Sequence, residues 1–244
     1  MKKLLILLSA FALTASAQEE SGTWTSAGIS KKVSKRLSLD GELELRTANT
    51  LQNIDSWRLG FGAGYKLTPW LKANAGYTFI YDYNPRDTTY NARGRANKVN
   101  KVYFSPRHRL YASLTASKNL GDFSLQLRER WQYTWRPQQD GVRMDLQDDE
   151  DSPQYGYTYS RKGSASHVWR NRLKLGYQLG KKFQPYLSGE TYYSTSFDKF
   201  RLKLGTDISL SKHHSLDVGY LFQRTYTDTD ANRHILNIGY EYKF

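Results

Sequence analysis

Apolar and polar residues alternate with a period of two along most of the chain. In residues 57–67 the odd positions are apolar and the even positions are Arg, Gly or Lys. The same alternation covers residues 37–46, 123–135, 169–179 and 200–210. Alternation over about ten residues is typical of a β-strand with one apolar and one polar face.

The connections between these strands fall into two classes. Short turns lie near residues 33–36, 68–69, 119–121, 180–182 and 212–213, and longer polar connections cover about 48–53, 82–103, 137–165, 195–198 and 227–231. Transmembrane barrels have short turns on one side, longer loops on the other, and aromatic residues at the strand ends. The sequence therefore predicts an all-β fold, a transmembrane antiparallel up-and-down β-barrel, in preference to a soluble β-domain with the apolar face as its core.

The number of strands is less clear than their type. The pattern contains about eleven segments of strand length. Single-chain bacterial barrels use even numbers of strands, so we expect either ten or twelve.

The first residues indicate export. Met1, Lys2 and Lys3 precede an apolar run over 4–13 and the small residues Ala15-Ser16-Ala17. This order is typical of a secretory signal peptide, and the apolar run is too short for a spanning helix. We expect residues 1–17 to be cleaved near Ala17 and residues 18–244 to form the barrel in the outer membrane of a Gram-negative-type cell.

The composition narrows the class of partner. The formal charge of +13 falls to +11 when Lys2 and Lys3 are removed, and the chain has no cysteine. Basic residues are spread one or two per strand without a basic stripe, which argues against nucleic acid as a partner. The mean hydropathy of −0.72 agrees with strands that are apolar only at alternate positions. Outer-membrane lipid is the expected partner, and we expect a monomer.

The last eight residues resemble the C-terminal signal that the barrel-assembly machinery reads. Its positions are matched by Asn237, Gly239, Tyr242 and the terminal Phe244. We therefore expect that machinery to be a partner during biogenesis.

The polar faces of the strands carry many charges, with basic groups in excess. The residues expected to line the lumen are Glu42, Glu44, Arg46, Arg58, Lys72, Arg109, Arg128, Arg130, Arg170, Arg172, Lys174, Glu190, Arg201, Lys203 and Asp207, together with Asp217 and Glu241. Two interpretations remain open: an ion-pair network that packs the lumen, or a narrow pore that prefers anions because rings of Arg and Lys select them.

Catalysis and metal binding have weaker support. His108, His167 and His234 fall on the lipid-facing parity, but Ser105 and Ser166 lack the same-face spacing of a lipid-face hydrolase. Such a phospholipase-like hydrolase is the alternative function. The acidic segment 140–151 lacks the spacing of a calcium loop, so no metal, cofactor or catalytic residue is expected.

Several segments together resemble a known family. They are the strand 39–46, the hairpin 58–77, the strand start 107–110, and the stretches 127–130 and 170–173. Across the mature part the chain resembles the domain of unknown function 2490 family, predicted outer-membrane barrels of Bacteroidetes-type bacteria. The resemblance implies a barrel and its location, and it supplies no activity or ligand.

Overall fold

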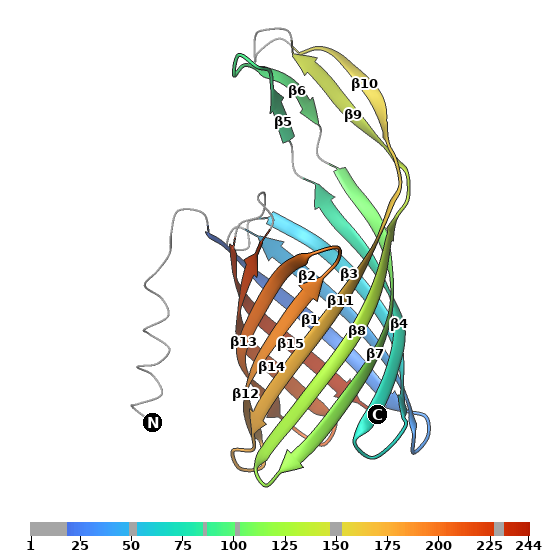
Figure 1. Ribbon diagram of the computed structural model, residues 1–244, viewed down its shortest axis with the longest axis vertical. Coiled ribbons are helices and arrows are strands. Elements are labelled where there is room, and N and C mark those ends of the chain that lie inside the picture. The colour runs from blue at the N-terminus through green and yellow to red at the C-terminus, as the bar shows by residue number, and fades with distance from the viewer. Residues whose placement is uncertain (1–18, 49–52, 85–86, 101–102, 147–152, 227–231) are drawn as a thin grey trace.

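The computed structural model describes residues 19–48, 53–84, 87–100, 103–146, 153–226 and 232–244, so the expected signal peptide lies outside the described residues. Eleven strands form one closed barrel (Figure 1). In their order around the wall they are β1 (Glu19–Lys32), β15 (Asn232–Lys243), β14 (His214–Thr225), β13 (Phe197–Ser209), β12 (Phe183–Tyr193), β11 (Ser164–Tyr177), β8 (Phe123–Arg136), β7 (Tyr103–Leu120), β4 (Leu71–Asn84), β3 (Asn53–Lys66) and β2 (Leu37–Ala48).

The strand number differs from the expected ten or twelve. With eleven strands the first and last run in the same direction, and β1 pairs with β15 in parallel from Glu19↔Asn232 to Ser30↔Lys243. The other wall pairs are antiparallel, so the barrel is mixed rather than purely antiparallel. The expectation of an even number of strands is wrong here because the first and last strands can also form their interstrand hydrogen bonds as a parallel pair, which closes the barrel.

Two of the expected long loops contain strands. Residues 82–103 include β5 (Asp87–Tyr90) and β6 (Ala96–Asn100), and residues 137–165 include β9 (Gln139–Leu146) and β10 (Pro153–Arg161). They form a second sheet in the order β10-β9-β6-β5, which projects beyond the barrel rim (Figure 1). The sheet depends on β6 pairing with β9, for example Lys98↔Asp145, a long-range contact that local sequence does not reveal.

The short turns gather at the opposite end of the barrel, here called the short-turn end. Gly121 and Gly180 occupy two of these turns with φ of +62° and +66°. Side chains with a Cβ rarely adopt this left-handed region, and glycine adopts it without that steric cost.

The alternation sorts side chains to the two faces of the wall. Leu59, Leu127, Leu173 and Leu204 are exposed on the outward face, and Trp57, Trp135, Trp169 and Tyr193 are exposed near the long-loop end. Large buried apolar residues are few among the described residues, and one small cluster joins Trp24, Leu221 and Ile235. In the described part of the chain, no helix is long and apolar enough to cross a membrane.

Candidate functional site

The lumen holds a central cavity of about 310 Å³ that is lined mainly by charged side chains. Nine cations and three carboxylates contribute to its wall. The cations are Arg46, Arg58, Arg109, Arg128, Arg130, Arg170, Arg172, Arg201 and Lys203, and the carboxylates are Glu42, Glu44 and Glu190. Each was expected in the lumen from strand parity.

Glu190 of β12 is the main counter-charge in this cavity. The guanidinium of Arg128 donates to Glu190 Oε1 at 2.6 Å, and that of Arg170 donates to both carboxylate oxygens at 2.9 and 2.8 Å. The Tyr192 hydroxyl donates to Oε2 at 2.7 Å. Register brings these groups together, because Arg170 lies opposite Tyr192 and Arg172 lies opposite Glu190. One carboxylate is thus shared between two arginines from different strands.

A second cluster surrounds the inward ring of Trp24 on β1. The guanidinium carbons of Arg46 and Arg201 lie 3.5 and 4.6 Å from the centre of that ring. Glu44 pairs with Arg46 and lies 3.5 Å from Arg58 Nε. The flat guanidinium group is suited to stacking on an aromatic face, which holds both arginines across the lumen.

Four arginines of the cavity have no ion pair with a carboxylate within the described residues, and one of them is Arg201, whose Nε donates to the Gln223 side chain at 2.8 Å. Arg109 Nε donates to the Thr134 hydroxyl at 3.1 Å, and Arg172 donates to the Gln126 side chain. Arg130 lies over the Tyr111 ring at 4.4 Å. The Nε atoms of Arg130 and Arg172 are buried without a hydrogen-bond partner. Buried donors of this kind are available to an oxyanion.

The short-turn end of the lumen has the opposite charge. A cavity of about 550 Å³ there is lined by five carboxylates, from Asp40, Glu42, Asp207, Asp217 and Glu241, and by one cation, Lys243. The long-loop end has a cavity of about 410 Å³ with eight cations and two carboxylates in its wall. It shares Arg46, Arg58, Arg109, Arg170 and Arg201 with the central cavity. The lining of the lumen is therefore mainly basic from the long-loop end to its centre, and carboxylates outnumber cations in the lining of the cavity at the short-turn end.

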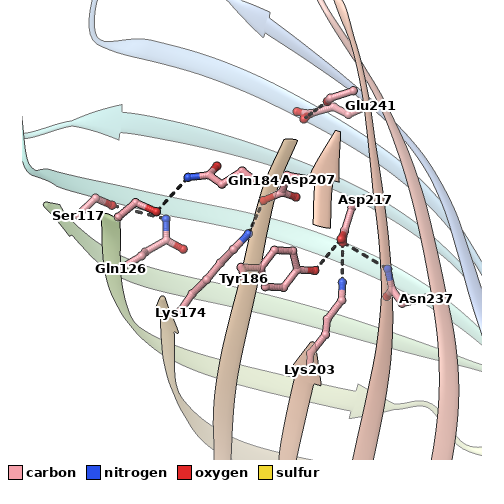
Figure 2. A network of polar contacts seen from close by, with 12 residues as sticks. Ser117, Gln126, Lys174, Gln184, Tyr186, Lys203, Asp207, Asp217, Asn237 and Glu241 are labelled. Carbon is pink, nitrogen blue, oxygen red and sulfur yellow. Dashed lines mark hydrogen bonds and ion pairs between the residues drawn. The ribbon is translucent and has the colours of Figure 1, made fainter. Parts of the chain in front are cut away.

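Figure 2 shows how the acidic end is organised. Lys174 Nζ lies 2.7 Å from Asp207, and Lys203 Nζ lies 2.5 Å from Asp217. The Tyr186 hydroxyl also donates to Asp217, at 2.6 Å. Lys174, Lys203 and Asp207 each take part in an ion pair of this end of the lumen. Strand alternation had placed all three on the inward face.

The remaining sequence-predicted residues lie apart from the central cavity, except Asn237, which is part of its lining. Lys72 is on an inward position of β4 opposite Lys66, and it lines none of the three lumen cavities. In the expected assembly signal, the Asn237 side chain reaches Asp217 at 3.4 Å, while Tyr242 and Phe244 stack edge to face at 4.6 Å. Gly239 lies opposite Asp217 in the register.

Sequence reasoning missed the aromatic members of the lumen. Trp24, Tyr111 and Tyr192 point inward beside arginines. A Cβ on Gly76 of the neighbouring strand β4, or on Gly62 of β3, would lie 2.5 or 2.6 Å from the Tyr111 hydroxyl, so glycine at both positions leaves room for that ring. The alternation contained the signal, because these aromatic residues occupy the positions in their strands that alternate with the apolar, outward ones.

The outward histidines lie among aromatic rings. His108 accepts or donates a hydrogen bond with the Tyr77 hydroxyl at 2.7 Å and stacks on Trp135, and His167 stacks on Trp131. Ser166 lines the lumen, and Ser105 is buried. A serine and a histidine at adjacent or odd-spaced positions of a strand point to opposite faces, so neither pair has the geometry of a nucleophile and its base.

No group of three or more metal-ligating side chains occurs among the described residues. The acidic segment is only partly covered, because Asp148, Asp149, Glu150 and Asp151 lie outside the described residues.

Comparison with known proteins identifies a family. No curated protein matches the chain. Among solved structures, the chain is similar to the NanC porin in a rhombohedral crystal form, with 13% identity, coverage of 88% of this chain and 93% of the other, and a TM-score of 0.47. A family model described as "Protein of unknown function (DUF2490)" matches residues 21–234, so the chain belongs to the DUF2490 family.

Proposed function

We propose that this protein is an outer-membrane barrel whose lumen is a narrow, anion-preferring pore. The observation that carries the proposal is the central cavity, where nine cations face three carboxylates. Rings of Arg and Lys select anions in a pore because they lower the electrostatic energy of an anion at the constriction and raise that of a cation.

The outward face supports a position in the membrane. Leucines at 43, 59, 110, 127, 173 and 204 are exposed, on strands distributed around the wall. Exposed apolar side chains on a closed wall match the lipid-facing band of an outer-membrane barrel. In this proposal lipid is the partner of the outward face, and the barrel-assembly machinery is the partner of the C-terminal segment during insertion.

The choice of anion follows from the unpaired arginines. Arg109, Arg130 and Arg172 keep donors free of carboxylates, whereas Arg128 and Arg170 are engaged by Glu190. Planar guanidinium groups bind carboxylates and phosphates through paired hydrogen bonds. Small oxyanions are therefore the class of solute that this lumen favours.

A structural lumen is the second candidate, and the ion pairs of Glu190 favour it. Buried charges need partners, and a barrel of about this size can be filled by its own side chains. In that case the arginines pack the interior and no ion crosses. The two candidates differ in conductance, which makes them separable.

The test is single-channel recording of the detergent-purified mature protein in planar bilayers with a salt gradient. We expect discrete conductance steps with a reversal potential on the anion side. The double variant Arg109→Gln/Arg130→Gln should shift the reversal potential toward the cation side. Lys72→Gln, which removes an inward cation outside the cavities, is the matched control and should leave selectivity nearly unchanged. A stably inserted barrel without conductance would refute the pore and favour the structural lumen.

A further inference from the structure

Three polar side chains lie side by side on the mainly apolar outward face of the wall. They are Glu129 on β8, Asn171 on β11 and Thr191 on β12. Register places them side by side, since Asn171 pairs with Glu129 and also with Thr191. We call these three residues the polar stripe.

Apolar residues surround the stripe on both sides. Trp131 and Trp169 form the adjacent outward row toward the long-loop end, and Leu127 and Leu173 form the row toward the short-turn end. β8 spans Phe123–Arg136, so Glu129 lies six residues after its first residue and seven before its last. The carboxylate therefore lies near the middle of a membrane-crossing strand rather than at an interface.

Glu129 is exposed and has no hydrogen bond or ion pair within the described residues. It borders an apolar hollow of about 560 Å³ on the wall, whose lining includes Ala75, Ala112, Trp131 and Trp169. A carboxylate that faces lipid at mid-depth is unfavourable, and ionisable residues within the membrane usually have a partner. The stripe therefore needs a group that covers it.

We propose that a second copy of this chain covers the polar stripe, so that the barrel forms a two-fold dimer through β8 and β11. The stripe contains an acceptor, the Glu129 carboxylate, and a donor, the Asn171 amide. Consider a two-fold axis that runs along the membrane normal and passes between β8 and β11 of the two copies. It places β8 of one copy opposite β11 of the other, and each residue keeps its depth in the membrane. The Asn171 amide of each copy then donates to Glu129 of the other.

The depth of the polar stripe in the membrane favours a second copy of this chain over a different protein. Two copies inserted in the same orientation place their stripes at the same height without further adjustment, and an isologous interface requires only that one patch be self-complementary. Close packing of polar groups across such an interface stabilises membrane-protein association. The dimer replaces the monomer expected from the sequence, and it stands independently of the pore.

Crosslinking in native outer membranes tests the dimer. The chain has no cysteine, so a single introduced thiol is unique. Leu173→Cys, which borders the stripe on β11 and leaves Glu129 and Asn171 in place, should give a dimer band when treated with a short bismaleimide. Leu43→Cys on β2, which is outward and exposed on a distant part of the wall, is the matched control and should give none. No dimer from Leu173→Cys, or an equal amount of dimer from both variants, would overturn the proposal.

The mass of the protein in detergent supplies a second test. Light scattering should give twice the chain mass for the unmodified barrel and a single chain mass for Glu129→Leu/Asn171→Leu. This variant makes the outward face more apolar, so loss of folding is not expected, and heat-modifiable gel migration checks that the barrel is intact. A folded variant that remains dimeric would overturn the assignment of the polar stripe as the dimer interface.

Discussion

Replacing Glu190 with Gln should destabilise the barrel more than any other single neutralisation in the lumen. Gln keeps the size of the side chain and loses the charge that Arg128 and Arg170 share. The side chains of both arginines are 13% exposed and that of Glu190 is 10% exposed, so water screens the contacts poorly. Removing one partner of a buried ion pair costs roughly 3–5 kcal/mol, and we expect about 4 kcal/mol here.

The assay is urea unfolding of the barrel in phospholipid vesicles, followed by tryptophan fluorescence and analysed by linear extrapolation. Glu241→Gln is the matched control. Its carboxylate lies 3.0 Å from Lys243, with side chains 41% and 52% exposed. An exposed pair of this kind contributes about 0–1 kcal/mol, so the control should unfold close to the unmodified protein.

A double variant checks the mechanism behind the magnitude. If the cost of Glu190→Gln arises from guanidinium charge left without a counter-charge, Glu190→Gln/Arg128→Gln should recover part of the lost stability. A loss below about 1 kcal/mol for Glu190→Gln, equal to that of the control, would refute the reasoning and would mean that lumen water screens these charges.

Three further predictions concern the lumen, the closure and the assembly of the barrel. Asp40→Asn/Glu241→Gln should make the anion preference stronger, because these carboxylates line the acidic end of the lumen, and a reversal potential that moves the other way would contradict the charge asymmetry. Outer-membrane barrels have their longer loops outside the cell. An epitope tag placed immediately before Glu19 should therefore be labelled on intact cells, because β1 begins at the long-loop end. A tag in the Gly121 turn should be labelled only after the outer membrane is opened, and labelling of both tags only after that opening would refute the parallel closure. Deleting Phe244 should lower the amount of folded barrel several-fold, as measured by heat-modifiable gel migration, without changing the amount of exported chain. An unchanged amount of folded barrel would mean that Phe244 is not part of the assembly signal.

The sequence by itself determined the wall of the barrel and the face on which each side chain lies. Successive residues of a strand point to opposite faces, so the alternation through Arg128 and Arg130 was enough to place both inside. The same alternation predicts that Glu129 points outward between Leu127 and Trp131.

The tertiary structure decided the features that depend on how distant strands meet. Closure by a parallel β1–β15 pair set the strand number at eleven, and pairing of β6 with β9 turned two expected loops into a second sheet. Strand register determined that Arg128 and Arg170, among the nine cations of the central cavity, are the partners of Glu190. Parity is a local property of the backbone, whereas register and closure depend on contacts between residues far apart in the chain, and local pattern does not encode those contacts.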